Sequence, residues 1–471
     1  MSVEVERRLV FDISTIADWV DTPVGTVRIE RALAARACRH MRAVVFAVFD
    51  PNKGAYREIR NEWRDAIIAG RAVIDPMAFH AARSRRSHLS DRIPQTLRPL
   101  LNPRRALLMG LEGLRILRAD TVRAKLIDVL QRGLMSEKYS RQMLNPDGGR
   151  RDFISYDLAL GAVVSFAPDD VLVCVGWQWQ YDMAWLRTVK AETRFKFVLL
   201  CHDILMLLWP TLYGSHRVNA FKKWIEEIMP LADLVIFTTE TARADTVRYC
   251  DAHRIAIRSS RVVRPGVEKL PRRLGAARLP HGIEAEHYAL CVSVLDRRKG
   301  HRLLYEIWLR LLAEGVPQYA RFKLVLVGEP HGIDAELLHA MQDEVRLDHS
   351  LKLLQRVGDA ELAELYSGSA FCLFPSLYEG YGLPIIEAFT YGKAVIASTG
   401  GALPEVVAGL SPCLDPGDSE AWYRTLKAWI LDPAIRRPYE EAIKATFRHP
   451  DWDEAAATFF NTIETKATST I

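Results

Sequence analysis

The chain has 471 residues, of which 49% are hydrophobic and 26% charged, and a formal net charge of +5 at pH 7. This composition is typical of soluble globular proteins with two or three domains. The longest apolar runs, such as residues 171–177, are too short to span a bilayer, and residues 1–8 precede no apolar signal-peptide core. The seven cysteines form no C-x-x-C pair and no zinc-like cluster, so we expect a cytoplasmic protein with reduced thiols.

The first half of the chain alternates short apolar runs with helical patterns, as expected for a parallel sheet with helices on both faces. The predicted strands are residues 9–13, 43–49, 171–175, 195–201, 234–238 and 261–263. Four cysteines of the chain lie inside apolar strand-like runs and are predicted to be buried, namely Cys174, Cys201, Cys291 and Cys372.

A basic stretch interrupts this alternation between Arg83 and Arg151, with 16 Lys or Arg residues against 6 Asp or Glu residues. Its helix-like patches predict a helical insertion. Basic residues beside an apolar face are typical of docking on an anionic membrane surface, but they also suit an insertion whose arginines face water or pair internally. The sequence leaves both interpretations open. A nucleic-acid site is disfavoured, because Tyr139 is the only aromatic residue there for stacking.

A second alternation begins at residue 288, with predicted strands at residues 288–294, 322–327, 351–354, 370–374, 394–397 and 412–414. Residues 268–287, rich in Pro, Gly, Arg and Ala, are the predicted linker. The chain is therefore predicted to be an α/β protein in which two doubly wound domains face a cleft at the carboxyl ends of their strands. A terminal helix is predicted from Trp452, and we expect Asp451 and Asp453 to cap it rather than to bind a metal.

Residues 370–388 carry the strongest functional signal, which is an apolar strand, a glycine-rich loop and a helix with proline in its first turn. The unpaired N–H groups at a helix start, with the positive end of the helix dipole, form a seat for an anion such as a diphosphate. Gly380 and Gly382 are predicted to let the backbone approach that ligand. Glu379 and Glu387 flank the seat. Because carboxylates repel phosphate, we expect these two to accept hydrogen bonds from sugar hydroxyls.

This stretch, F-P-S-L-Y-E-G-Y-G-L-P-I-I-E-A, resembles the E-x7-E motif of retaining glycosyltransferases of family 4, the glycosyl transferases group 1. The resemblance implies the GT-B fold, which consists of two Rossmann-like domains. We expect an amino-terminal acceptor domain at residues 1–267, with the basic helical insertion at 83–151, and a nucleotide-sugar domain at 288–448. The resemblance also implies that residues 449–471 form a helix crossing back to the first domain.

Residues 292–300 are similar to the G-x-L-x-x-R-K-N/G stretch of the same family. The chain departs from that pattern at Ser293, where glycine is usual, and at Val294, where many relatives have arginine. Arg298 and Lys299 match the two basic positions. Fixed cations beside a diphosphate stabilise the charge that grows as the sugar bond breaks, so these two side chains are expected to hold the leaving group.

Smaller segments extend the resemblance. His202 begins an H-D turn, and in the family this histidine contacts the donor sugar. Gly25 lies in P-V-G-T-V-R, which resembles the family's G-I-x-R loop near the diphosphate or acceptor, and Asp12 and Asp18 are acceptor-side candidates. The predicted catalytic residues are His202, Glu379 and Lys299, and the predicted donor site comprises Gly25, Arg298, Lys299, Arg356, Val357, Glu379, Gly380, Tyr381, Gly382, Leu383 and Glu387.

The resemblance implies transfer of a hexose from a nucleoside-diphosphate sugar to a glycan or lipid-linked glycan, with retention and without a metal or other cofactor. Glu387 would hold the ribose and Glu379 the sugar, while the leaving phosphate takes the acceptor proton. The motif wording is closest to mannosyl- and rhamnosyl-type transferases of bacterial surface polysaccharide or exopolysaccharide synthesis, acting in the cytoplasm at the inner face of the membrane. Three alternatives stay open: a catalytically silent GT-B scaffold, a nucleotide-sugar epimerase and a sugar phosphorylase.

Overall fold

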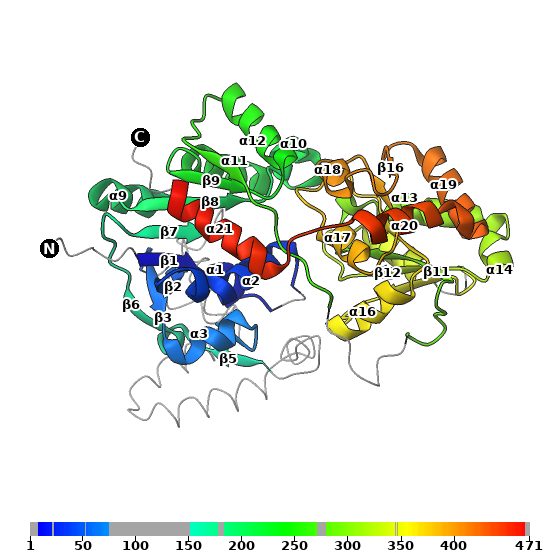
Figure 1. Cartoon of the computed structure of the whole chain (residues 1–471), viewed down its shortest axis with the longest axis horizontal. Coiled ribbons are helices and arrows are strands. Elements are labelled where there is room, and N and C mark those ends of the chain that lie inside the picture. Colours follow the sequence, from blue (N-terminus) through cyan, green and yellow to red (C-terminus); the bar gives the residue numbers. More distant parts are fainter. Residues whose placement is uncertain are drawn as a thin grey trace, which may run out of the picture.

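The computed structural model describes residues 8–20, 23–51, 53–74, 151–177, 183–270, 279–343, 345 and 347–466. They form two lobes, each built around its own sheet (Figure 1). The predicted insertion at 83–151 lies outside the described residues, apart from Arg151. That side chain is buried and donates a hydrogen bond to the carbonyl of Val20.

The amino-terminal lobe contains an eight-stranded sheet in the order β10-β9-β8-β7-β1-β2-β3-β6. Its strands are β1 (Arg8–Asp12), β2 (Ala43–Asp50), β3 (Ala55–Ile59), β6 (Leu160–Val163), β7 (Val171–Cys174), β8 (Lys196–Cys201), β9 (Leu234–Phe237) and β10 (Ser260–Val262). All six strands predicted for this half are present and parallel, with ends shifted by one residue at most.

The edge of this sheet differs from the prediction. β3 pairs antiparallel with β2 and with β6, and two further short strands, β4 (Ala72–Ile74) and β5 (Asp152–Ile154), form a separate parallel pair. The sequence analysis missed all four. β3 reads A-Y-R-E-I, and Arg57 is paired with Asp50 at 3.2 Å, so its charged residues hide the apolar signal on which the strand predictions depend.

Helices cover both faces of the first sheet. Leu9 and Phe11 of β1 face one side, where the first and the last long helices of the chain pack, whereas Val10 faces the opposite helical layer. The helices of this lobe are α1 (Ser14–Ala17), α2 (Gly25–His40), α3 (Asn61–Ile68), α8 (Tyr156–Ala159), α9 (Met183–Thr193), α10 (Leu205–Leu208), η5 (Pro210–Leu212), α11 (Ser215–Ile228) and α12 (Glu240–Ala252).

The carboxyl-terminal lobe contains a six-stranded, wholly parallel sheet in the order β13-β12-β11-β14-β15-β16. The strands are β11 (Tyr288–Val292), β12 (Lys323–Val327), β13 (Leu351–Leu354), β14 (Phe371–Phe374), β15 (Val395–Ser398) and β16 (Cys413–Leu414), each within two residues of its prediction. The strand order reverses between β11 and β14. Ligands of open α/β sheets bind at such a switch point, outside the carboxyl ends of the strands.

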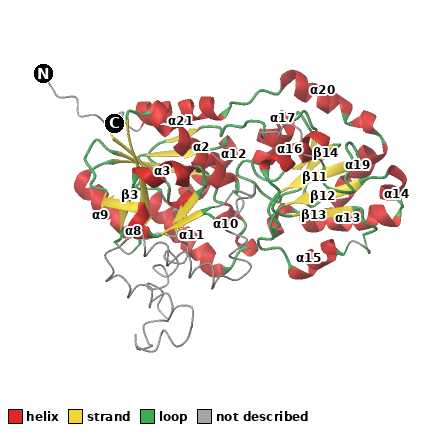
Figure 2. Ribbon diagram, turned by 90° about the horizontal axis from the view of Figure 1, so that it is seen from below, coloured by secondary structure: helices red, strands yellow, loops and turns green. Residues whose placement is uncertain are grey.

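The helices of the second lobe lie on both faces of its sheet (Figure 2). They are η6 (Arg297–Lys299), α13 (His301–Ala313), α14 (Val316–Ala320), α15 (Ala335–Gln342), α16 (Asp359–Gly368), α17 (Leu383–Thr390), α18 (Leu403–Val407), α19 (Ser419–Leu431), η7 (Pro433–Ile435) and α20 (Arg437–Thr446).

The last helix, α21 (Trp452–Lys466), leaves the second lobe and packs beside α2 of the first (Figures 1 and 2). Asp451 caps it, because its Oδ1 accepts hydrogen bonds from two backbone N–H groups at 2.8 Å. The capping role predicted for Asp453 is wrong. That carboxylate instead forms ion pairs with Arg36 at 2.5 Å and with Arg39 at 3.2 Å, and so ties α21 to α2.

The two segments that join the lobes run side by side. The backbone N–H of Val267 donates to the carbonyl of Pro450 at 3.0 Å, and a Cβ on Gly266 would lie 2.5 Å from the Cα of Trp452. Within the described residues, no helix is long and apolar enough to cross a membrane. The four cysteines predicted to be buried are buried and free.

Candidate active site

A cleft of about 1640 Å³ lies between the two lobes and is lined by residues of both. Every residue of the predicted donor site and all three predicted catalytic residues line it. Asp12 and Asp18, the acceptor-side candidates, do not. Asp12 is turned inward, where its carboxylate accepts hydrogen bonds from the N–H of Ser14 at 2.9 Å and the hydroxyl of Tyr56 at 3.0 Å.

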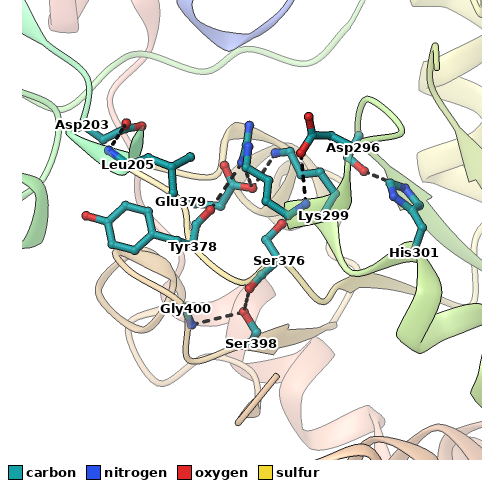
Figure 3. A network of polar contacts seen from close by, with 12 residues as sticks. Asp203, Leu205, Asp296, Lys299, His301, Ser376, Tyr378, Glu379, Ser398 and Gly400 are labelled. Carbon is teal, nitrogen blue, oxygen red and sulfur yellow. Dashed lines mark hydrogen bonds and ion pairs between the residues drawn. The ribbon is translucent and has the colours of Figure 1, made fainter. Parts of the chain in front are cut away.

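The loops that follow β11 and β14 meet at the switch point of the second sheet. The N–H of Leu377 donates to the carbonyl of Arg298 at 2.7 Å, and a Cβ on Gly300 would lie 2.3 Å from the carbonyl oxygen of Pro375. The left-handed φ of +72° at Gly300 allows this approach. Behind the second loop, Ser398 of β15 donates to the carbonyl of Ser376 (Figure 3). The contact between the loops fixes the side chains that follow.

Glu379 accepts hydrogen bonds from two cations of the facing loop. Its Oε1 lies 2.5 Å from Nζ of Lys299 and 2.9 Å from Nη1 of Arg298 (Figure 3). Glu379 and Lys299 are both buried. Burial alone would raise the pKa of Glu379, but the two cations lower it to about 2. The carboxylate is therefore ionised at neutral pH, and it is a weak base.

Two helices begin at the cleft. In the first turn of α17, Pro384 has no N–H and the N–H of Ile385 donates to the carbonyl of Gly382 at 3.0 Å, which leaves the N–H of Leu383 for a ligand. α17 starts after Gly382, whose φ of +106° is left-handed, and α2 starts at Gly25; neither helix has a side-chain cap or an acidic residue in its first turn. A Cβ on Gly25 would lie 3.6 Å from Cδ1 of Leu383, so the two helix starts face each other. The positive ends of both helix dipoles thus converge on one place, which favours an anion.

Glu387 lies one turn into α17 and is buried. Its Oε2 accepts a hydrogen bond from the hydroxyl of Tyr366 at 2.9 Å. Its Oε1 is paired with Nη1 of Arg28, which comes from α2 across the cleft. The tyrosine ring is stacked on Tyr391 at a centroid distance of 5.5 Å, which fixes the orientation of the carboxylate from within its own lobe.

His202 follows β8 and reaches the cleft from the amino-terminal lobe. Its Nε2 lies 2.8 Å from the carbonyl oxygen of Val175, which can only accept, so Nε2 carries the proton. Burial lowers the pKa of His202 below its usual 6.5. The ring is therefore neutral at pH 7 and offers Nδ1 as an acceptor for a ligand hydroxyl.

Gly380 has a different neighbour from the one expected. A Cβ on it would lie 2.5 Å from the carbonyl oxygen of His202 and 2.8 Å from Oδ2 of Asp203. Its own carbonyl accepts a hydrogen bond from the hydroxyl of Thr239 at 2.9 Å. In this structure, glycine is therefore needed here for a close approach between the two lobes. This corrects the prediction for Gly380, because the space left by its missing Cβ is filled by the other lobe and not by a ligand.

Other contacts between the lobes surround that point. The carboxylate of Glu405 accepts hydrogen bonds from the N–H groups of Glu240 and Thr241, both at 2.9 Å, at the start of α12. The hydroxyl of Tyr378 donates to Asp245 at 2.7 Å. These contacts hold α12 of the first lobe against the second lobe beside the cleft.

The remaining predicted residues lie at the two ends of the site. Arg356 and Val357 follow β13, and the N–H of Arg356 donates to Oε1 of Glu329 at 2.6 Å. The hydroxyl of Tyr381 lies 2.5 Å from Nε2 of His449, on the segment that returns to the first lobe. Ser293 replaces a glycine of the family pattern. Its hydroxyl oxygen lies 3.1 Å from Nε2 of His301.

The sequence analysis did not single out the side chains of Arg28 and Tyr366, which hold Glu387. Arg28 lies in the motif that was used to predict Gly25, so its position was visible although its role was not. Tyr366 stands in an ordinary helical pattern, and nothing in the sequence near it indicates a functional residue.

Two Rossmann-like domains that face a cleft, with a helix returning from the second to the first, define the GT-B fold. Among solved structures, that of Anabaena Alr3699/HepE in complex with UDP and glucose is similar to this chain, with a TM-score of 0.55 and 14% sequence identity. The match covers 98% of this chain and 100% of that one. At this identity the likeness concerns the fold.

Residues 278–446 match the family described as glycosyl transferases group 1. O-antigen chain mannosyltransferase B of Escherichia coli is 27% identical over 242 residues, which are 50% of this chain and 60% of that protein. The serotype-specific mannosyltransferase WbdA of the same species is 26% identical over 298 residues, 58% of this chain and 36% of that one. The chain thus spans between about a third and three fifths of these curated relatives. The chain has the GT-B fold, and its residues 278–446 match the glycosyl transferases group 1.

Proposed function

We propose that this protein is a retaining glycosyltransferase that moves a hexose, with mannose favoured, from a nucleoside-diphosphate sugar to a glycan or lipid-linked glycan. The observation that carries the proposal is the arrangement at the switch point. Two uncapped helix starts face each other, Arg298 and Lys299 lie on the same loop beside them, and Glu387 is buried one turn away. This is a site for a diphosphate that is attached to a hydroxyl-rich group.

Each part of the donor has a partner in this proposal. The diphosphate lies between the starts of α2 and α17, next to Arg298 and Lys299. The ribose hydroxyls donate to Glu387, and the sugar hydroxyls donate to Glu379 and to Nδ1 of His202. The base lies beyond β13, towards Val357. All of these groups line one cleft.

In the reaction, the bond between the anomeric carbon and the phosphate oxygen breaks, and a bond to the acceptor oxygen forms on the same face of the sugar. Glu379 is a poor base, because its pKa is about 2 and two cations hold it. We therefore assign the acceptor proton to the leaving phosphate oxygen. Arg298, Lys299 and the helix start of α17 stabilise the growing charge of the diphosphate, which supports a reaction that needs no metal ion.

The mannose preference and the polysaccharide acceptor rest on the relatives, whose names state mannosyltransferase and O-antigen chain. A role in bacterial surface or exopolysaccharide synthesis follows from the same names. If the acceptor is carried on a lipid, the enzyme would work at the inner face of the cytoplasmic membrane.

The first test is a thermal-shift screen with GDP-mannose, UDP-glucose, ADP-glucose and dTDP-rhamnose, since a ligand that binds only the folded state raises its apparent stability. We expect one nucleotide class to raise the melting temperature. Transfer from that donor to a mannose-terminated oligosaccharide is then followed in the presence of EDTA, and the anomeric configuration of the product is determined by NMR.

Transfer with retention in EDTA would support the proposal in full. Inversion would overturn the mechanism, and loss of transfer in EDTA would overturn the metal independence. Phosphate-dependent release of a sugar phosphate, or epimerisation of the donor without an acceptor, would replace the transferase with one of the other two enzyme classes. A protein that binds none of the four donors would favour the scaffold alternative.

A further inference from the structure

Arg28 extends from the first turn of α2 to the opposite lobe, where its Nη1 is paired with Oε1 of Glu387. The arginine side chain is 29% exposed and that of Glu387 is 1% exposed. A cation of the amino-terminal lobe is therefore paired with the carboxylate that binds the ribose in the proposed function.

The two partners of Glu387 differ in how readily they can leave. Tyr366 belongs to the same lobe, and its ring is stacked on Tyr391. Arg28 belongs to the other lobe, and it lines the cleft together with Glu387. Its guanidinium is paired with Oε1 of Glu387, so a ribose hydroxyl can bind that oxygen once Arg28 moves aside. Tyr366 can keep the other oxygen throughout.

Arg28 is anchored close to the place where the diphosphate would lie. It is three residues after Gly25, which faces Leu383 at the start of α17. A guanidinium that leaves Glu387 inside the cleft needs a new anion, because an unpaired charge in a partly buried site is costly. The diphosphate of the donor supplies that anion, and a guanidinium can hold its oxygens in a two-pronged hydrogen bond.

We infer that Arg28 is a ligand of the donor diphosphate. In the free protein the guanidinium is paired with Glu387, and the ribose hydroxyls replace it there when the donor binds. This inference rests on the proposed function and adds a residue to it. In the exchange, Glu387 replaces its cation by hydrogen bonds from the ribose hydroxyls, while Arg28 replaces the carboxylate by the diphosphate. A nucleoside without phosphate would displace Arg28 and offer it nothing in return. Arg28 therefore makes the site selective for the diphosphate.

The experiment measures how much tighter a nucleoside diphosphate binds than its nucleoside. Isothermal titrations use GDP with guanosine, UDP with uridine, ADP with adenosine and dTDP with thymidine, on the wild type and on Arg28→Gln, and the affinity ratio is taken for the pair that the wild type binds. We expect Arg28→Gln to weaken the diphosphate by about tenfold or more, the size of one lost charge-assisted hydrogen bond. The nucleoside should bind to Arg28→Gln as tightly as to the wild type or more tightly, because the guanidinium that competes with it for Glu387 is gone.

Arg39→Gln is the matched control, since Arg39 lies on the same helix, pairs with Asp453 at 3.2 Å and does not line the cleft. It should leave the ratio within about twofold of the wild type, well below the loss of one charged hydrogen bond. Arg28→Lys keeps the charge without the planar fork, and we expect a ratio between those of the wild type and Arg28→Gln. It also serves as the test variant should Arg28→Gln not fold.

Two results would overturn the inference while leaving the proposed function standing. One is an unchanged ratio in Arg28→Gln and Arg28→Lys. The other is an equal loss for the diphosphate and the nucleoside, which would make Arg28 a link between the lobes and nothing more. A wild type that binds none of the four diphosphates would instead refute the proposed function, and the inference with it.

Discussion

Two buried glutamates, one in each lobe, have pKa values that are shifted in opposite directions. Glu379 in the carboxyl-terminal lobe is paired with Arg298 and Lys299, and its pKa is lowered to about 2. Glu30 on α2 in the amino-terminal lobe is fully buried, and burial raises its pKa well above the usual 4.5. Its Oε1 accepts a hydrogen bond from the N–H of Ile16 at 3.2 Å, while its Oε2 has no partner among the described residues.

The difference shows that burial alone does not decide whether a carboxylate in this protein is charged; the cations placed around it do. The carboxyl-terminal wall of the cleft carries preformed, paired charges. The amino-terminal wall presents the neutral ring of His202, and one of its cations, Arg28, is paired with the opposite wall. The two walls therefore differ in how their charged groups are paired, because Glu379 is paired within its own lobe whereas Arg28 is paired across the cleft.

The strongest test of this comparison is Glu379→Gln, which keeps the shape and removes the charge. Lys299 would then be buried, and Arg298 half-buried, without their counterion, and breaking a buried ion pair costs about 3–5 kcal/mol of stability. We expect a loss of that order in urea-induced unfolding at pH 7. A variant as stable as the wild type would mean that the two cations are already satisfied by other groups.

The second test is Lys299→Ala, which removes a cation from the proposed leaving-group site. We expect a loss of about 2–4 kcal/mol in transition-state stabilisation, seen mainly as a lower kcat with the best donor. Lys427→Ala is the control, since Lys427 pairs with Glu314 on the surface of the same lobe at 2.6 Å. Turnover like that of the wild type in Lys299→Ala would remove Lys299 from the catalytic residues.

The third test concerns the neutral wall. Because the pKa of His202 is lowered from 6.5, activity should fall as the pH falls through a value below 6.5, about tenfold per pH unit, since a protonated ring cannot accept a hydroxyl. The same direction holds for stability, because the unfolded state takes up the proton first as the pH falls below 6.5. Glu379 cannot cause this acid limb, since its pKa is about 2.

His202→Gln, which also offers an acceptor but does not titrate, should remove that limb and retain part of the activity. The measurement is a pH profile of kcat/KM from pH 4.5 to 8 for both proteins. The same acid limb in His202→Gln would assign it to another group.

The smallest effect is expected for Glu30→Gln, the counterpart of the first substitution. A folded-state pKa above the unfolded value means that Glu30 supports stability below pH 4.5 and loses that contribution as the pH rises through its folded-state pKa. At pH 7, Glu30→Gln should therefore be within about 1 kcal/mol of the wild type or more stable than it. Urea unfolding at pH 7 and pH 4.5 checks this, and a large loss at pH 7 would mean that Glu30 has a cation as its partner.

The sequence predicts the parallel strands and the loops that follow them because both signals are local. A strand buried on two faces is a continuous apolar run, as in V-L-V-C of β7, and the glycines and proline that begin α17 stand within a few residues of Glu379. The placement of predicted residues on one cleft then follows from the topology, because parallel strands end at one edge of a sheet.

The sequence could not show the contacts that depend on how the two lobes meet. Arg28 and Glu387 are 359 residues apart, and their ion pair depends on the relative position of the lobes. The need for glycine at position 380 also depends on how the lobes meet, since it is explained by the carbonyl of His202 on the other side of the cleft. A motif indicates which residues matter, but it does not indicate which of them contact each other across the domain boundary.

The packing of α21 on the first lobe has a consequence for synthesis on the ribosome. Phe459, Phe460 and Ile463 are buried, and the ring of Phe460 lies 6.4 Å from that of Phe11 on β1. The core around the first strand is therefore completed by residues near the end of the chain. Until those residues have left the exit tunnel, the nascent first lobe exposes an apolar strip along α2. A truncated or stalled product would keep that strip exposed, which makes it a substrate for chaperones and proteases.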